Sequence, residues 1–295
     1  MRTSLALITM LAIKLACLPP LKAEDEVPAI PSTDITLFSI DENLRLTKVD
    51  AGNALNAFRY DGYDNQPYFS ADGKQLFFTR MLEQQTDIFS YHFEHQELRN
   101  ITNSEDISEY SPTVFDESSL SVIGVNEKGQ QHLRLVNLED AAQKVLNAEV
   151  EPVGYHAWLN PETAAVFVLG DVMTLQLLDV RGETKAKPLA ENIGRCLQRM
   201  EDNLVSFTLF KDGLHHLYSV NHNGAIASLD IVLPEGVQDY VWWDSEGVIV
   251  GMESQLWYIS STNKKKIADL NDSGINNISR LALDSNKKKL AIVYE

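Results

Sequence analysis

The sequence predicts an all-β protein that folds as a six-bladed β-propeller of four-stranded blades. The first observation is a pattern of strand, tight turn, strand, loop and strand that recurs about every 43 residues from residue 65 onward. A period of that length in an all-strand pattern is typical of propellers. The second is that the last copy, residues 280–295, stops after two strands, while residues 34–49 supply two further strands. The third is length, because six copies fill residues 33–295, which we expect to form one domain.

The first copy shows the repeat most clearly. In residues 69–78 (FSADGKQLFF) two apolar runs flank a polar turn, and the Asp-Gly pair supplies the left-handed conformations that a hairpin turn needs. Phe69, the apolar residue before this turn, has counterparts in the later copies at Val114, Trp158, Met200, Trp243 and Leu283. The alignment of the copy near Met200 is prone to an offset.

The third strand of each copy is rich in aliphatic and aromatic residues, as expected for strands. A short fourth strand follows, as in residues 98–102 and 267–270. Residues 138–150 (LEDAAQKVLNAEV) have a composition compatible with a helix, but the register of the repeat predicts a turn and a fourth strand. The third strands are expected at residues 87–91, 132–136, 175–179, 216–220 and 256–260.

The two ends of the chain are expected to form the sixth blade together. Residues 34–40 (DITLFSI) and 44–49 (LRLTKV) correspond to the two strands missing from the last copy. Joined to residues 280–295, they complete a blade, which closes the ring and leaves no open sheet edge. We therefore expect the segment around Phe38 to lie alongside the segment around Ile292.

The first copy resembles the WD40-like repeat of the TolB propeller family. That repeat runs Pro-x-Phe-Ser-Pro-Asp-Gly-Lys-x-Leu-x-Phe, then Asp-Ile-Tyr and Leu-Thr. Residues 67–78 read PYFSADGKQLFF, 87–89 read DIF and 100–102 read NIT. The resemblance implies a bacterial envelope protein with a non-enzymatic binding role. The α/β domain that precedes the propeller in TolB is not expected here. Related repeats occur in peptidase propellers and polysaccharide lyases, so the repeat indicates fold more firmly than function.

The first residues are typical of an export signal. Arg2 supplies a positive charge, residues 5–13 form an apolar run too short to span a bilayer, and Ala23 fits a cleavage site. We expect residues 1–23 to be a signal peptide and residues 24–32 to form a short acidic tail.

Lipidation at Cys17 is the alternative, and it would make the chain a lipoprotein. A lipid-attachment site usually carries an apolar residue three positions before the cysteine, where this sequence has Lys14. The signal peptide is therefore favoured, and we expect the protein in the periplasm or outside the cell. Export leaves Cys196 without a disulfide partner in the chain, and we expect it to pack as a small apolar side chain.

The chain is strongly acidic, with 25 Lys and Arg against 42 Asp and Glu residues and a net charge of −17. Such a charge repels phosphate polymers, which argues against nucleic acid and anionic lipid as partners. A solvated acidic surface explains the charge, and an acidic patch for a basic partner is the alternative. We expect a monomer with no transmembrane segment after signal removal, and an envelope protein or peptide as its partner.

The sequence carries no catalytic signature. It has no Gly-x-Ser-x-Gly elbow, no phosphate-binding Gly-rich loop, no His-Glu-x-x-His and no paired-cysteine zinc spacing. Acid pairs at 105–106, 139–140 and 201–202 are expected to be solvated turn residues, with calcium as the alternative. We therefore predict no catalytic residue, no metal and no cofactor.

The predicted fold brings one group of candidate binding residues together at a mouth of the central channel. The inner strand of every propeller blade starts at the same mouth of the central channel, so residues just before these strands should meet in space. Tyrosine offers a rigid surface with a hydroxyl group, and arginine offers a fork for carboxylates. The alternative is that such residues only seal the channel and bond to backbone groups. The predicted ligand- or partner-binding residues are Asn65, Gln66, Tyr110, Tyr155, His156, Arg199, Tyr240 and Asn276.

Three functions remain open on the sequence. The favoured one is a non-catalytic binding module of the cell envelope that docks a protein or peptide through one face of the ring. The second is a sensor or carrier that holds a small ligand in the channel. The third is an enzyme acting on a glycan or peptide, with carboxylates or His156 as candidate groups. The four tryptophans are expected to pack between blades rather than to form a sugar platform.

Overall fold

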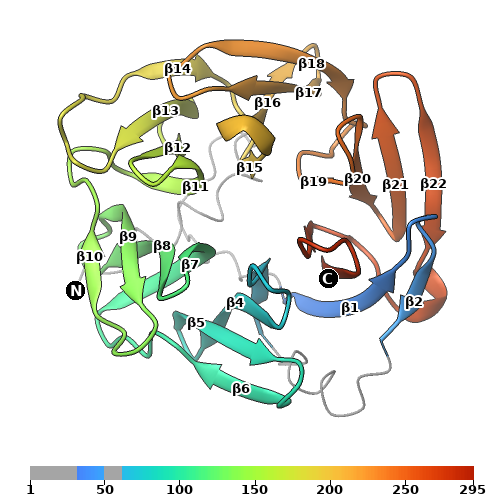
Figure 1. The fold of residues 1–295 in the computed structure, drawn as a ribbon, viewed down its shortest axis with the longest axis horizontal. Coiled ribbons are helices and arrows are strands. Elements are labelled where there is room, and N and C mark those ends of the chain that lie inside the picture. Colours follow the sequence, from blue (N-terminus) through green and yellow to red (C-terminus); the bar gives the residue numbers. More distant parts are fainter. Residues whose placement is uncertain (1–31, 50–61) are drawn as a thin grey trace, which may run out of the picture.

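A computed structural model describes residues 32–49 and 62–295 of the chain. In these ranges the strands form six antiparallel sheets of four strands each, arranged as blades around a central axis (Figure 1). The predicted six-bladed propeller is therefore confirmed. The predicted signal peptide and almost all of the predicted acidic tail lie outside the described residues. Within the described residues no helix is long and apolar enough to cross a membrane.

The blades follow one another along the chain. Blade 1 comprises β3 (Asp64–Phe69), β4 (Gln75–Leu82), β5 (Gln85–His92) and β6 (Glu97–Asn100). Blade 2 comprises β7 (Ile107–Asp116), β8 (Ser119–Asn126), β9 (Gln131–Asn137) and β10 (Gln143–Val145). Blade 3 comprises β11 (Val153–Asn160), β12 (Thr163–Val168), β13 (Thr174–Asp179) and β14 (Pro188–Glu191).

The last three blades continue around the ring. Blade 4 comprises β15 (Gln198–Arg199), β16 (Val205–Lys211), β17 (Leu214–Val220) and β18 (Ile226–Val232). Blade 5 comprises β19 (Val241–Trp242), β20 (Gly247–Met252), β21 (Gln255–Ser260) and β22 (Lys264–Asp269). Blade 6 comprises β23 (Arg280–Leu283), β24 (Lys289–Tyr294), β1 (Asp34–Ile40) and β2 (Leu46–Lys48).

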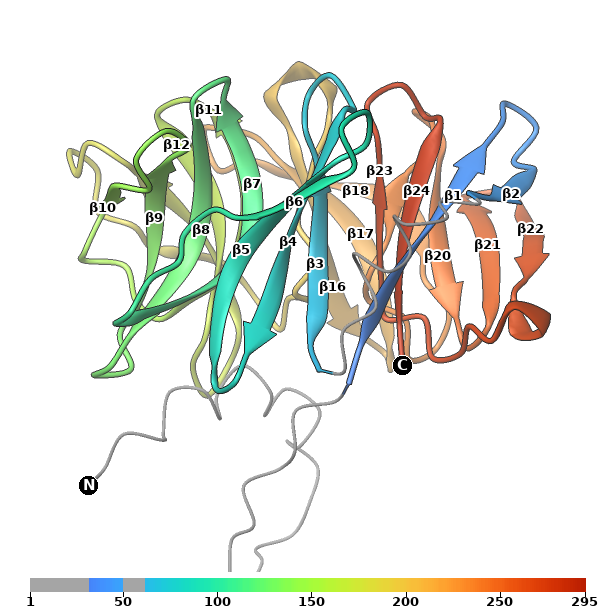
Figure 2. The ribbon, with the colours of Figure 1, turned by 90° about the horizontal axis from the view of Figure 1, so that it is seen from below.

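The sixth blade joins the two ends of the described chain. Its strand order is β2-β1-β24-β23, and β1 runs beside β24 in Figure 2. In the antiparallel register Thr36 lies opposite Ile292 and Phe38 lies opposite Leu290. The expected pairing of the segments around Phe38 and Ile292 is therefore confirmed.

Alternate residues of β24 face opposite neighbours, as the two-residue period of a strand requires. Val293 belongs to a buried apolar cluster with Leu76 and Phe78 of blade 1. Ile292 belongs to a second cluster with Ile249 of blade 5. The strand that closes the sheet thus also fills the two blade interfaces on either side of it.

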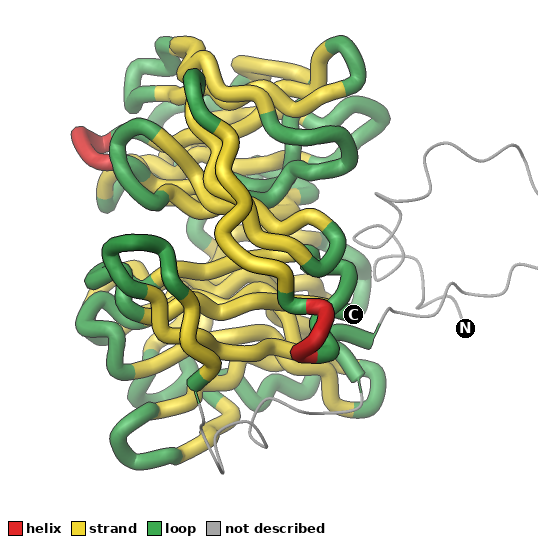
Figure 3. Tube along the Cα trace, turned by 90° about the vertical axis from the view of Figure 1, so that its right-hand side faces the viewer, coloured by secondary structure: helices red, strands yellow, loops and turns green. Residues whose placement is uncertain are grey.

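Two strand boundaries differ from the prediction. The strand expected over residues 44–49 is shortened to β2, because Leu44 has a φ of 63° and its N–H closes a turn onto Asp41. The offset near Met200 arises because a 3-10 helix, η2 (Glu201–Asn203), replaces the tight turn between β15 and β16. A second one, η3 (Asn271–Ser273), precedes blade 6, and both are red in Figure 3. Residues 138–150 form a turn and β10, as expected.

Removing the N-terminal strands tests the closure directly. A chain that begins at residue 50 lacks β1 and β2, so β24 loses its partner and the clusters around Val293 and Ile292 lose one wall. We expect this chain to aggregate or to unfold well below the melting temperature of a chain that begins at residue 32, because an exposed apolar strand edge promotes association. Circular dichroism and size-exclusion chromatography would show this. Equal stability of the two chains would contradict the closure.

Candidate functional site

Two cavities lie along the ring axis, one at each mouth. The wide chamber, of about 930 Å³, opens on the face where the inner strands end, and the narrow chamber, of about 570 Å³, opens on the face where they begin. Five side chains with polar groups line both chambers, and four of them form what we call the dividing layer: Tyr155, Arg195, Asp239 and Arg280.

A hydrogen bond spans the channel within the dividing layer. The guanidinium Nη2 of Arg280 donates to the hydroxyl of Tyr155 at 2.8 Å, and the guanidinium carbon stands 5.0 Å from the centre of the Tyr155 ring. These residues belong to blades 6 and 3, which are opposite each other in a ring of six. The bond therefore crosses the channel where the two chambers adjoin.

Two arginines of the dividing layer share one carboxylate. Arg195 donates from Nε and Nη2 to Asp239 Oδ2 at 2.9 and 2.6 Å. Arg280 donates from Nη1 to Oδ1 of the same residue at 3.4 Å. The neighbouring Tyr63 hydroxyl adds no negative charge, since burial raises its pKa above the ordinary value even though Arg280 acts to lower it. The layer therefore carries an excess of positive charge inside a strongly acidic protein.

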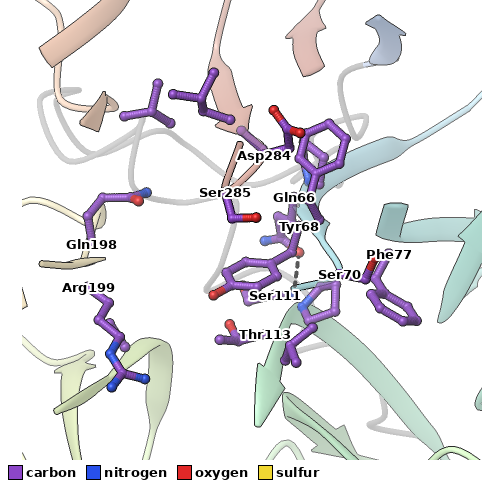
Figure 4. Close-up of a pocket in the computed structure, with 18 of the residues that line it drawn as sticks. Gln66, Tyr68, Ser70, Phe77, Ser111, Thr113, Gln198, Arg199, Asp284 and Ser285 are labelled. Carbon is purple, nitrogen blue, oxygen red and sulfur yellow. Dashed lines mark hydrogen bonds between the residues drawn. The ribbon is translucent and has the colours of Figure 1, made fainter. Parts of the chain in front are cut away.

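The wide chamber holds an exposed tyrosine and an unpaired arginine. Tyr68 is the one exposed residue of β3, at 37%, and its exposed part faces the chamber. Figure 4 shows its ring in the middle of the pocket, with Gln198 and Arg199 on the opposite wall. Burial by the walls raises the Tyr68 pKa, and Arg199 acts in the opposite direction. Arg199 is exposed, and its guanidinium forms no ion pair or hydrogen bond with any other described residue.

Short polar side chains surround this pair. Ser111, Thr113 and Ser285 line the wide chamber beside Tyr68 (Figure 4). Gln66 lies at the boundary between the chambers, where its Oε1 accepts hydrogen bonds from Thr79 Oγ1 at 2.9 Å and from the Ser111 N–H at 2.8 Å. Gln66 thus joins blade 1 to blade 2 and leaves Tyr68 and Arg199 as the groups free to meet a ligand.

Two of the predicted site residues instead join neighbouring blades. His156 Nε2 lies 2.6 Å from Ser121 Oγ, which also accepts a 2.8 Å hydrogen bond from Trp158 Nε1. The same arrangement recurs two blades further on, where Ser206 Oγ accepts from the Tyr240 hydroxyl and from Trp242 Nε1, each at 2.8 Å. We call these two arrangements the serine clamps.

Burial fixes the protonation state of the first clamp. It lowers the pKa of His156 from 6.5 to about 3, so the imidazole is neutral at physiological pH. His156 is 6% exposed and Tyr240 is 1% exposed. Their walls contribute to the wide chamber, but their positions are set by the blade interface. Trp158 and Trp242 pack in those interfaces, as the sequence predicted.

The structure distributes the predicted site residues over both ends of the channel rather than one mouth. Gln66 and Tyr155 line both chambers, and Asn276 lines neither of them. The physical reason is that these residues stand at different positions along their strands: Asn65 and Tyr110 lie four residues before the aligned Phe69 and Val114, whereas Arg199 lies one residue before the aligned Met200. The narrow chamber receives Asn65 and Tyr110. The wide chamber receives His156, Arg199 and Tyr240.

Sequence reasoning missed Tyr68 and the two arginines of the dividing layer. Tyr68 lies inside the best-matched repeat, between Pro67 and Phe69, and nothing in the sequence marks it as the exposed residue of an otherwise buried strand. Arg280 opens the last inner strand, and Tyr155 lies 125 residues earlier. Nothing in a linear pattern pairs two positions so far apart.

Cys196 packs as the sequence predicted. It is 7% exposed within the apolar cluster between blades 4 and 5, and burial raises its pKa to about 12. Its thiol lies 3.4 Å from the Tyr240 carbonyl oxygen. Among the described residues no group of three or more His, Cys, Asp or Glu side chains could hold a metal ion.

Known structures share this fold at low sequence identity. A proposed TolB from Agrobacterium tumefaciens superposes with a TM-score of 0.67 and 11% identity, over 89% of this chain and 98% of that one. Oligogalacturonate lyase from Vibrio parahaemolyticus superposes with a TM-score of 0.54 and 12% identity, over 80% and 79% of the two chains. The predicted likeness to TolB propellers is thus confirmed for the fold. The same fold also serves a lyase, so it does not select between binding and catalysis.

A further TolB, from Acinetobacter baumannii, matches over 61% of this chain with 15% identity and a TM-score of 0.46. The chain spans 46% of the length of that protein. The sequence itself matches no known family profile and no curated protein.

The serine clamps predict a specific loss of stability. Replacing Ser206→Ala leaves the Tyr240 hydroxyl and the Trp242 N–H without their acceptor. A buried polar group without its partner costs about 1–3 kcal/mol, and we expect that loss in chemical denaturation. Ser118→Ala, at an exposed turn, is the matched control and should change the free energy of unfolding by less than about 0.5 kcal/mol.

The depressed pKa of His156 predicts a pH dependence. The unfolded chain binds a proton on this residue near pH 6.5, whereas the folded chain does so only near pH 3. Stability should therefore fall as the pH drops below 6.5, by about 2 kcal/mol at a pH of about 5. His156→Gln keeps a polar group near Ser121 but cannot titrate, so its stability should fall less over this range. Parallel pH curves for the two proteins would contradict the assignment.

Proposed function

We propose that this chain is a non-catalytic binding module of the bacterial cell envelope, which docks a protein or peptide partner at the wide mouth of the ring. The observation that carries this proposal is the pairing of Tyr68 and Arg199 across the wide chamber. Both side chains project into open space, and Arg199 has no partner among the described residues. Tyrosine and arginine are the residues that most often anchor protein interfaces.

The shape of the wide mouth supports insertion of a segment of the partner. The turn between β3 and β4 and the turn between β7 and β8 contribute Asp72 and Glu117 to the chamber lining, and the turn after β23 contributes Lys287. The dividing layer closes the far end at the Arg280–Tyr155 hydrogen bond. An inserted segment would therefore contact the chamber wall and stop at the layer, while the turns contact the rest of the partner.

The catalytic alternative receives less support. His156 was its candidate acid or base, and that imidazole is neutral, buried and bonded to Ser121. The acidic turn residues Asp72 and Asp116 accept hydrogen bonds from backbone N–H groups of their own turns.

A small-ligand carrier is the second candidate. The wide chamber, at about 930 Å³, lies within the range of about 300–1,000 Å³ typical of small-molecule sites. Its Tyr68 and Arg199 would then hold the ligand instead of a peptide. The envelope location rests on the export signal expected from the sequence and on the fold that the chain shares with TolB propellers.

Two substitutions in the wide chamber test the docking role. Tyr68→Ala and Arg199→Ala should each weaken capture of the partner by roughly thirtyfold, because truncation of an interface anchor costs about 2 kcal/mol or more. Phe210→Ala and Arg181→Ala are matched controls, since both residues are exposed and outside the chambers. Partners would be crosslinked in envelope extracts, identified by mass spectrometry and titrated against each variant.

A thermal-shift screen separates docking from carriage. A small ligand that binds only the folded chain raises its melting temperature, and Tyr68→Ala should abolish that rise if the chain is a carrier. Partner capture that is equal in all four variants would contradict docking at the wide mouth. Turnover of a glycan or peptide by the wild-type chain would contradict the non-catalytic role.

A further inference from the structure

We propose that the dividing layer is a carboxylate-binding site at the floor of the wide chamber. The inference deepens the proposed docking role and rests on it for the source of the carboxylate. Its starting point is the charge of the layer. Arg195 and Arg280 share a single carboxylate, that of Asp239, so one positive charge lacks a counterion among the described residues.

The two guanidinium groups retain hydrogen-bond donors for a ligand. The Arg195 bonds use its Nε and Nη2 atoms, and the Arg280 bonds use Nη1 and Nη2. Arg195 Nη1 and Arg280 Nε have no partner in the part of the chain that the structure describes. A planar guanidinium presents such N–H groups in a fork that fits the two oxygens of a carboxylate. The layer thus offers both an uncompensated charge and directed donors.

These donors are sheltered but reachable. The side chains of Arg195, Arg280 and Asp239 are 22%, 13% and 13% exposed, and all three line both chambers. An ion pair or hydrogen bond gains strength where water is partly excluded. A carboxylate arriving here would therefore bind more tightly than at an arginine on the outer surface.

The charges at the two mouths set the route of entry. The narrow mouth carries three exposed acids, Glu235, Glu253 and Glu295, which repel an anion. The wide mouth carries the unpaired Arg199, which attracts one. Four acids, Asp72, Asp116, Glu117 and Asp284, also line the wide chamber, and three of them accept hydrogen bonds from backbone N–H groups of their own turns. The wide mouth differs from the narrow one in that it offers an entering anion two cations, Arg199 and Lys287, before the anion meets the layer.

The charge balance favours a carboxylate over a doubly charged anion. One carboxylate neutralises the single excess charge of Arg195, Arg280 and Asp239, whereas sulfate leaves an unmatched negative charge in a sheltered site. The carboxylate could come from a docked peptide, through its C-terminus or an acidic side chain, or from a small free acid. These sources present the same group to the layer.

The test uses the full chain and three probes. They are acetate, a short neutral peptide with a free C-terminal carboxylate, and the same peptide with an amidated C-terminus and one glutamate. Binding is measured by calorimetry and by shifts in NMR spectra. Wild-type protein should bind at least one probe, and sulfate should bind at least tenfold more weakly than that probe. The probe that binds best identifies the source of the carboxylate.

Variants of the layer supply the decisive comparison. Arg195→Gln should weaken binding of that probe about tenfold, since it removes a charge-assisted donor. Asp239→Asn should strengthen it severalfold, since it removes the competing carboxylate and frees the donors of both arginines. Arg181→Gln, at an exposed site outside the layer, should leave it unchanged. Circular dichroism confirms that each variant is folded, and Arg280→Gln replaces Arg195→Gln if that variant unfolds.

A purely structural role of the layer predicts a different result. In that case the folded Asp239→Asn and Arg195→Gln variants bind the probes as wild type does, or wild type binds none of them, and either result overturns the inference. If capture of the partner is insensitive to Tyr68→Ala and Arg199→Ala while acetate still binds at the layer, the docking role fails and the carboxylate site stands. If capture depends on Tyr68 and Arg199 but no carboxylate binds, the docking role stands and the carboxylate site fails.

Discussion

The antiparallel pairing of β1 with β24 is the contact on which the other features of the ring depend. It supplies the middle of blade 6, and the alternating side chains of β24 fill the interfaces toward blades 5 and 1. The spacing of the six inner strands around the axis, and with it the distance between Arg280 and Tyr155, follows from this closure.

The dividing layer carries a charge opposite to that of the whole molecule. The chain has a net charge of −17, yet in the layer two arginines share one aspartate, Asp239, and Arg199 lines the wide chamber nearby. Two of these arginines are satisfied by Asp239 and Tyr155, which makes their burial tolerable. The third, Arg199, has no such partner in the described residues.

The architecture was predictable because the same pattern of strands and turns recurs in the sequence once per blade. A turn such as Asp72-Gly73, recurring strand lengths and two half-blades at the ends suffice to predict six blades and their closure, down to the pairing of the Phe38 and Ile292 segments. The site was less predictable, because it depends on depth along the axis. Asn65 lies four residues before the aligned Phe69 and Arg199 one residue before the aligned Met200, so the two side chains line different chambers.

The hydrogen bond between Arg280 and Tyr155 links blades 6 and 3, which share no interface. A ligand bound in the channel beside this bond would therefore act on both blades at once. A ligand that competes for the Arg280 guanidinium would break the hydrogen bond between these opposite blades. The neighbouring blades joined through Ser121 and Ser206 would keep their relative positions. Ligand binding in the channel would therefore change how freely blades 3 and 6 move relative to each other, without any rearrangement of the strands themselves.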